Sequence, residues 1–94
     1  MRTIERSTVF KRDFKKIKTH PIHKKNLDEL LSDILELLLV DKALPTANRD
    51  HSLSGNWEGY RECHIKPDLL LIYRKPDPAT LRLARIGSHS ELLK

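Results

Sequence analysis

The sequence predicts one α+β domain, in which two N-terminal helices pack on an antiparallel sheet and the elements follow the order β-α-α-β-β-β. Three observations lead to this fold class. The chain has 94 residues, a length that supports a single hydrophobic core, so one domain is expected over residues 1–94. Apolar residues recur at helical spacing in the first half of the chain. In the second half, clusters of turn residues separate short apolar runs that are typical of strands.

The first two elements are a short strand and an amphipathic helix. Residues 2–6 are expected to form the strand, and Ser7 is a candidate N-cap for the helix. Phe10, Phe14 and Ile17 recur at i, i+4 and i+7, which places them on one side of a helix. Basic residues occupy most of the remaining positions, so this helix is predicted to have a cationic outer face.

A second, longer helix follows the interruption at Pro21 and ends before Pro45. Its apolar stripe consists of leucine and isoleucine, namely Leu27, Leu30, Leu31, Ile34, Leu35 and Leu38. Turn residues then dominate residues 48–59, and helical periodicity stops there. This segment is therefore predicted to be a loop of functional length.

Three strands complete the chain, at residues 60–65, 69–73 and 80–87. Side chains alternate between the two faces of a strand, so Glu62 and His64 share a face of the first one. The continuous apolar run in the second strand suits the interior of a sheet. Tight connections between the strands fit an antiparallel arrangement, in which the helices cover one face and leave the other free for a ligand.

The formal net charge of the chain is +5, but the charge is distributed unevenly. Residues 1–25 contain nine basic and two acidic residues, for a net charge of +7, whereas residues 26–41 contain five acids and no lysine or arginine. A basic surface can bind nucleic acid, because phosphate contacts release counterions, or an acidic protein. The alternative is a well-solvated helix face. The candidate nucleic-acid-binding lysines on the first helix are Lys11, Lys15, Lys16 and Lys18.

Three histidines and two carboxylates gather in the second half of the chain. His51 lies in the polar loop, His64 shares a strand face with Glu62, Asp68 follows in a turn, and His89 comes after the last strand. Imidazole exchanges protons near neutral pH, and a neighbouring carboxylate can orient it. In a small basic protein this combination indicates acid–base chemistry on a phosphate polymer. The alternative is that each histidine is a hydrogen-bonded or merely exposed side chain.

Two arginines and two aromatic residues are further candidates for contact with a nucleic acid. Arg61 and Arg85 can hold phosphate, because guanidinium offers a planar fork of donors, or they can be ordinary surface residues. The face on which Arg85 lies depends on whether the last strand contains a bulge. Trp57 and Tyr60 can stack on a base, or Trp57 can plug the loop against the core.

The single cysteine, Cys63, excludes an internal disulfide and a cysteine-rich zinc site, which fits a reducing compartment. Its strand position groups it with Ile65 on the presumed core face, which argues against a nucleophilic role. The histidines lack the spacing of common metal-binding motifs, so no metal ion or other cofactor is expected. No leader-like or membrane-spanning apolar stretch is visible, and a cytoplasmic location is expected.

These residues belong to motifs that resemble the RelE/ParE superfamily of bacterial toxins, and the YafQ subfamily in particular. The matching segments are Asp50-His51-x-Leu53-x-Gly55-x-Trp57-x-Gly59-Tyr60-Arg61-x-x-His64, then Lys66-Pro67-Asp68-Leu69 with Ile72-Tyr73, then Arg85-x-Gly87-Ser88-His89. The basic helix, the leucine-rich helix and the predicted strand order are compatible with this resemblance, which covers nearly the whole chain. Together the motifs are specific.

The resemblance implies a RelE-like fold and a type II toxin, which is a ribosome-dependent, metal-independent endoribonuclease that cuts mRNA by attack of the 2′-hydroxyl. It assigns the steadying of the scissile phosphate to Arg85 and acid–base chemistry to His51, His64, Asp68 and His89, with Glu62 at a position that is acidic in the family. The base is one of His64, His51 and Asp68, and the acid is His89 or His51. Leu93 stands where relatives often have an aromatic residue that helps to place the RNA, so a weakened toxin is one alternative.

The implied partners are mRNA on the ribosome, ribosomal RNA and a cognate antitoxin of the DinJ or RelB kind. Operator DNA is expected to be contacted only through the antitoxin complex, and no membrane is involved. ParE-type relatives share the fold but attack gyrase, so a non-cleaving module that binds RNA, DNA or the antitoxin is the alternative from a different class. The histidines and Asp68 favour the ribonuclease.

Overall fold

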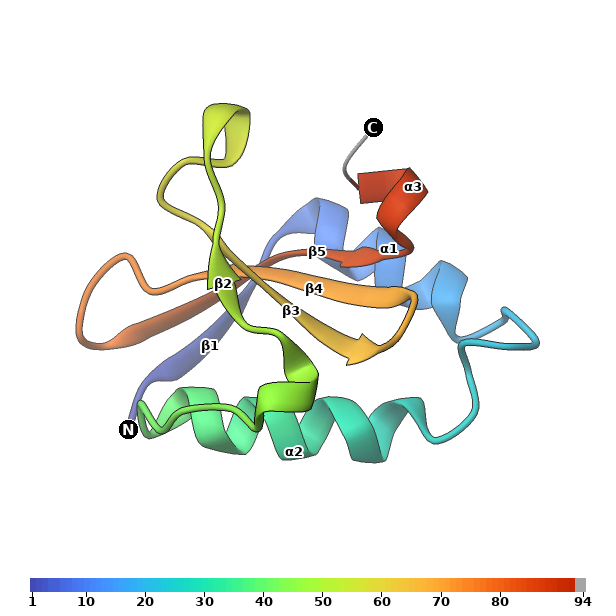
Figure 1. Cartoon of the computed structure of the whole chain (residues 1–94), viewed down its shortest axis with the longest axis horizontal. Coiled ribbons are helices and arrows are strands. Elements are labelled where there is room, and N and C mark those ends of the chain that lie inside the picture. Colours follow the sequence, from blue (N-terminus) through green and yellow to red (C-terminus); the bar gives the residue numbers. More distant parts are fainter. Residues whose placement is uncertain (93–94) are drawn as a thin grey trace.

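A five-stranded mixed sheet forms the centre of the computed structural model, which describes residues 1–92 (Figure 1). The strands are β1 (Thr3–Arg6), β2 (His51–Ser52), β3 (Arg61–Lys66), β4 (Leu69–Arg74) and β5 (Thr80–Gly87). Their order across the sheet is β1-β5-β4-β3-β2. Strands β3, β4 and β5 pair antiparallel, as predicted, and the short β2 adds an antiparallel partner to β3. The prediction of a fully antiparallel sheet is wrong at β1, which pairs with β5 in parallel. Parallel neighbours cannot be joined by a tight turn, and most of the chain lies between these two strands.

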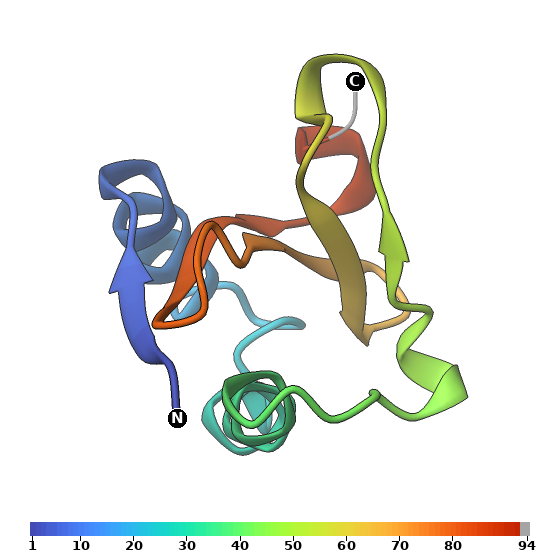
Figure 2. The same cartoon turned by 90° about the vertical axis from the view of Figure 1, so that its left-hand side faces the viewer.

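The predicted helices are present as α1 (Thr8–Ile17) and α2 (Leu27–Leu39), and a short α3 (His89–Leu92) follows β5. Ser7 caps α1 as predicted, because its side chain accepts a hydrogen bond of 2.9 Å from the backbone of Phe10. Figures 1 and 2 show α2 running beneath the sheet, and α1 packs beside β5. None of the helices within residues 1–92 has the length and apolar character needed to span a bilayer.

Between α2 and β3 the chain is less regular, as predicted, although it is not all loop. Turns of 3₁₀ helix occur at Thr46–Asn48 and Gly55–Trp57, and His51 and Ser52 form the short strand β2. The predicted order of the main elements is therefore confirmed, with β2 and α3 as short additions.

Apolar side chains form a main core between the helices and one face of the sheet. Its buried members are Phe10, Ile17, Leu27, Leu31, Ile34, Leu38, Cys63, Ile65, Leu69, Leu71, Tyr73, Leu81, Leu83 and Ile86. A smaller cluster of Leu70, Ile72, Ala84 and Leu92 lies on the opposite face, where Leu53, Trp57 and Tyr60 pack against it. The opposite face is thus partly covered by α3 and by the β2–β3 connection. Burial on both faces explains the continuous apolar run of β4.

A bulge in β5 decides the face on which Arg85 lies. Ile72 of β4 is paired with Arg85, but the next residue of β4, Tyr73, is paired with Leu83, so Ala84 is the extra residue. Because a bulge shifts the alternation by one position, Leu83 and Ile86 both face the main core. Arg85 consequently lies on the opposite face, on the side of Ile72.

Candidate active site

Four strands contribute to a row of paired positions on the sheet face opposite α2. The row consists of His51 on β2, Glu62 on β3, Ile72 on β4 and Arg85 on β5. Directly paired residues project from the same face of a sheet. His64 lies two residues after Glu62 and therefore projects from this face too. The predicted common face of Glu62 and His64 is confirmed, and His51 joins them because it lies in a strand rather than a loop.

A buried carboxylate stands between two imidazoles in this row. Glu62 Oε1 lies 3.6 Å from His51 Nε2 and 3.8 Å from His64 Nε2. The Glu62 side chain is only 3% exposed, whereas that of His51 is 51% exposed. Glu62 Oε2 is buried and has no hydrogen-bond partner among residues 1–92. The carboxylate therefore lies within ion-pair distance of both rings when they are protonated, and His51 is the more accessible of the two from solvent.

The orientation of the His51 ring follows from its second nitrogen. His51 Nδ1 lies 2.8 Å from the carbonyl oxygen of Arg49. Because a carbonyl only accepts hydrogen bonds, Nδ1 donates its proton in this contact. Nε2 is then the nitrogen that can exchange a proton with a substrate or with solvent. It is also the nitrogen nearest to Glu62.

Asp68 and His89 meet at the other end of the β3–β4 hairpin. Asp68 Oδ1 accepts a hydrogen bond of 3.2 Å from the backbone N–H of His89, the first residue of α3. The same helix start carries a capping box, in which the Ser88 N–H and hydroxyl donate to Glu91 Oε1 at 3.2 and 2.9 Å. Asp68 thus helps to place the segment that carries His89. The structure brings these two residues together through the His89 backbone.

Two further histidines, which the sequence analysis did not single out, line a pocket with Asp68. The pocket has a volume of about 610 Å³ and lies between the end of α1, residues 20–23 and α3. The rings of His20 and His23 are 4.4 Å apart, and burial, followed by the proximity of His20, lowers the pKa of His23. His64 instead borders a separate pocket of about 390 Å³. In the sequence, the spacing His20-x-x-His23 after a basic helix could have indicated that these two histidines lie close together.

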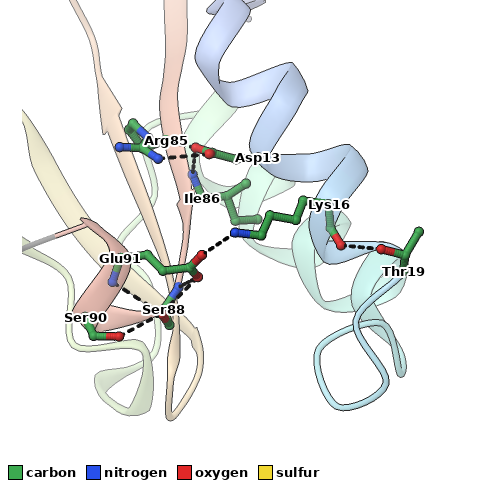
Figure 3. Close-up of polar contacts among 8 residues, drawn as sticks. All are labelled: Asp13, Lys16, Thr19, Arg85, Ile86, Ser88, Ser90 and Glu91. Atoms are coloured by element: carbon green, nitrogen blue, oxygen red, sulfur yellow. Dashed lines mark hydrogen bonds and ion pairs between the residues drawn. The ribbon is translucent and has the colours of Figure 1, made fainter.

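Arg85 is turned towards α1. Its Nε and Nη2 donate to the two carboxylate oxygens of Asp13 at 2.8 and 2.9 Å (Figure 3). This charged hydrogen bonding raises the pKa of Arg85. Ile72 separates Arg85 from Glu62 in the row, so the two are two strands apart, roughly 9.6 Å at the usual strand spacing. Arg85 therefore borders the histidine and carboxylate group without touching it.

The other predicted phosphate-binding arginine, Arg61, is bound elsewhere. Its Nε lies 3.3 Å from Asp50 Oδ1, which also accepts a hydrogen bond of 2.7 Å from the Tyr73 hydroxyl. Arg61 has the strand position of the main-core face, and it does not join Glu62 and His64. Trp57 packs against the smaller core, with its ring 5.2 Å from that of Tyr60. The loop-plugging alternative for Trp57 is the one that the packing supports.

Exposed lysines lie on the outer face of α1 and at its C-cap, as predicted. Two of the four candidate lysines take part in ion pairs, Lys16 with Glu91 at 2.9 Å and Lys18 with Asp28 at 3.5 Å. The full set of exposed candidates is Lys11, Lys15, Lys16 and Lys18. Their contact with RNA stays a prediction. Leu93 lies outside the described residues.

Cys63 and metal chemistry were alternatives to histidine catalysis. Cys63 is completely buried, and burial raises the pKa of its thiol to about 12, so the thiolate needed for nucleophilic attack is disfavoured. Over residues 1–92, no group of three or more histidine, cysteine, aspartate or glutamate side chains has an arrangement suited to a metal ion. The candidate acid–base groups that the structure brings together are Glu62 with His51 and His64, and, separately, Asp68 with the His89 backbone.

Comparison with known proteins identifies relatives of the chain. The model of the bacterial toxin of type II toxin–antitoxin systems, YafQ, matches residues 2–94. The chain is 37% identical over 93 residues to the mRNA interferase toxin YafQ of Escherichia coli strain B / BL21-DE3, which covers 97% of this chain and 95% of that protein. With the YafQ of strain K12 it shares 43% identity over 60 residues, or 62% of this chain and 64% of that protein.

Solved structures agree with this comparison. A copper-bound mutant toxin from Helicobacter pylori is 36% identical and superposes with a TM-score of 0.88 over 99% of this chain and all of that one. The toxin chain in the Escherichia coli DinJ–YafQ complex is 35% identical, with a TM-score of 0.81 over the full length of both chains. Both similarities extend over the strands that carry the candidate site.

Proposed function

The chain belongs to the YafQ family of bacterial type II toxins and is an mRNA interferase, and we propose that it cuts mRNA on the ribosome by metal-independent acid–base catalysis. The observation that carries this proposal is the carboxylate of Glu62, buried near the Nε2 atoms of His51 and His64 on the sheet face that α3 and the β2–β3 connection cover only in part. A buried acid that orients two imidazoles prepares both for proton transfer.

The reaction uses the nucleophile that RNA carries. The 2′-oxygen attacks the neighbouring phosphorus and loses its proton to a base, the bond between phosphorus and the 5′-oxygen breaks, and an acid protonates that oxygen. The products are a 2′,3′-cyclic phosphate, or the 3′-phosphate formed by its hydrolysis, and a 5′-hydroxyl. His64, His51 or Asp68 serves as the base, and His89 or His51 as the acid. Arg85 offsets the negative charge that develops on the phosphate oxygens.

The partners follow from the same activity. An antitoxin is a partner, because the relative from Escherichia coli is found in a complex with DinJ. A DinJ-like or RelB-like antitoxin would cover the basic face or block entry to the ribosome, and operator DNA would be bound through that complex. The exposed lysines of the α1 segment would lie against ribosomal RNA, and a cytoplasmic location is part of the same proposal.

The test is a cleavage assay with purified ribosomes and a translated mRNA, in which primer extension detects new 5′ ends. Wild-type protein should produce them, whereas His64→Ala and His89→Ala should each reduce the rate by roughly 10²- to 10⁴-fold, the usual contribution of a proton-transfer residue. Circular dichroism of both variants controls for folding. Full cleavage by both variants, or no cleavage by the wild type, would contradict the proposal, and the latter would favour a non-cleaving binding module.

A metal arm of the same assay is needed because the Helicobacter relative was crystallised with copper. Cleavage should continue in EDTA at an unchanged rate, because no step of the proposed reaction passes through a metal ion. A rate that falls in EDTA and returns with added copper would replace the metal-independent mechanism by a metal-dependent one.

A further inference from the structure

The carboxylate of Asp13 holds three donors of the strand that carries Arg85. Asp13 is the only acid in α1, whose sequence is otherwise rich in lysine. Its oxygens accept from Arg85 Nε at 2.8 Å, from Arg85 Nη2 at 2.9 Å and from the backbone N–H of Ile86 at 3.2 Å. Figure 3 shows Asp13 reaching from α1 to both neighbouring residues of β5. One side chain therefore fixes the guanidinium and the backbone next to it.

The geometry of the sheet explains why α1 reaches this strand. β1 ends at Arg6, opposite Leu83, so the edge of β5 has no strand partner from Ala84 onwards. α1 takes its place: the Ser7 hydroxyl donates to the carbonyl of Ala84 at 2.8 Å, and Asp13 accepts from Ile86. The Asp13 side chain is only 14% exposed. A bidentate pair in such a partly desolvated place is better defined than an ordinary surface ion pair.

The pairing leaves part of the guanidinium available. Asp13 occupies the edge formed by Nε and Nη2, and Nη1 makes no hydrogen bond among residues 1–92. The bulge at Ala84 places Arg85 on the face that carries Glu62 and His64. The Arg85 side chain remains 29% exposed, so its second edge can meet an oxygen of a bound phosphate.

We propose that Asp13 is a positioning residue, which holds the plane of the Arg85 guanidinium so that its second edge meets the scissile phosphate of the mRNA. This inference rests on the proposed function and extends it to a residue that touches neither RNA nor the histidines. A fixed guanidinium loses less conformational freedom when charge develops on the phosphate, so the benefit appears in the transition state. Asp13 therefore acts on the rate constant of cleavage rather than on binding of the ribosome.

The first test is Asp13→Asn, which keeps the size of the side chain and an oxygen that can accept from Ile86. The variant should cleave with a kcat lower by roughly ten- to a hundredfold and an unchanged KM for programmed ribosomes, because misplaced groups cost about that much. The double variant with Arg85→Ala should be no slower than Arg85→Ala alone. Independent, multiplicative losses in the double variant, or an unchanged kcat in Asp13→Asn, would overturn the positioning role.

Arg85→Lys gives a second route that leaves Asp13 and its bond to Ile86 in place. Lysine keeps the charge but cannot form the bidentate pair, so kcat should fall as it does in Asp13→Asn. Asp13→Glu keeps a carboxylate, so its kcat should lie between those of Asp13→Asn and the wild type. Wild-type kcat in Arg85→Lys would mean that charge alone matters, and would refute the inference. Glu5→Gln is the matched control. It breaks the ion pair of 2.6 Å between Glu5 of β1 and Arg82, which lies on β5 as Arg85 does, and it should leave kcat unchanged.

A readout besides cleavage separates this inference from the proposed function. The Nε–H of Arg85 should give a distinct, slowly exchanging NMR signal in the wild type and lose it in Asp13→Asn, while the signal of Arg82 stays unchanged. Failure of the wild type to cleave mRNA would remove the proposed function and leave this contact intact. Cleavage by the wild type without the NMR signal would remove only the positioning role.

Discussion

At the scale of single residues, Glu62 is where we expect stability and activity to conflict. It is the one charged residue among the buried polar side chains of residues 1–92, with 2% of its surface exposed, and its Oε2 has no partner there. A carboxylate in such a position loses hydration that its contacts only partly replace. The position fits the proposed role of Glu62 beside the two imidazoles better than it fits a gain in stability.

Replacing Glu62 by glutamine should therefore separate the two effects. Glu62→Gln removes the charge but keeps the shape, so the free energy of unfolding should rise by about 1 kcal/mol. The cleavage rate should fall at least tenfold, because an amide orients the imidazoles less strongly. Urea unfolding measures the change in the free energy of unfolding, and the ribosome assay measures the change in the cleavage rate.

Glu58→Gln is the control for Glu62→Gln, because Glu58 is an exposed acid in the β2–β3 connection. It should change neither the free energy of unfolding nor the rate of cleavage. A loss of stability in Glu62→Gln would show that the carboxylate is a net structural asset, in contradiction to the expected conflict.

At the scale of secondary-structure elements, α3 depends on its surroundings. It has four residues, too few to be helical alone, yet it carries His89. Three contacts hold it: the capping box of Ser88 and Glu91, the bond from the His89 backbone to Asp68, and the ion pair of Lys16 with Glu91. Glu91 takes part in two of these, so α3 should be sensitive to the charge on this carboxylate.

The stability that Glu91 supplies should depend on pH. Its hydrogen bonds with Lys16 and Ser88 lower the pKa of Glu91 from its usual 4.5 to about 2 in the folded protein. A carboxyl with a lowered folded pKa stabilises the protein above the unfolded value of 4.5, and this contribution disappears as the pH falls towards 2. Because 43% of the side chain is exposed, the effect should be below about 1 kcal/mol.

The measurement compares urea unfolding of the wild type and of Glu91→Gln over this pH range. The variant should be less stable near neutral pH, and the difference should narrow as the pH falls from 4.5 to about 2. Glu36→Gln, which changes an exposed acid of α2, controls for the general loss of charge. A difference that stays constant with pH would mean that the Glu91 side chain acts through packing alone.

At the scale of the whole molecule, the sequence predicted what depends on local pattern. The apolar stripe of α1, the cap at Ser7 and the buried strand at residues 69–73 are each determined by neighbours a few residues away, and all three are confirmed. The common face of Glu62 and His64 follows from strand alternation in the same way. The relative placement of Glu62 and His64 could therefore be predicted from residue types and their spacing.

What the sequence did not predict depends on pairing between distant segments. The parallel pairing of β1 with β5 joins the two ends of the chain, and the bulge at Ala84 is visible only in the register of β5 against β4. Asp13 and Arg85 are 72 positions apart, and their contact arises because β1 stops before β5 does. In the sequence, Asp13 was only an acid in a basic helix.

Cys63 offers a test of whether these distant segments unfold as one unit. Its side chain lies fully buried in the main core, and burial raises its thiol pKa to about 12, so thiol reagents can react only after the surrounding structure opens. The parallel pairing of β1 with β5 ties the first strand to the last, and the core connects both to β3. We expect labelling of Cys63 to require global unfolding, so that its rate rises with urea as steeply as the equilibrium constant for unfolding does.

A Ser32→Cys, Cys63→Ser variant, which has an exposed thiol on α2, is the control and should be labelled at once at any urea concentration. Labelling of Cys63 with a much shallower urea dependence would instead mean that β3, with Glu62 and His64, opens locally while the rest of the sheet stays folded.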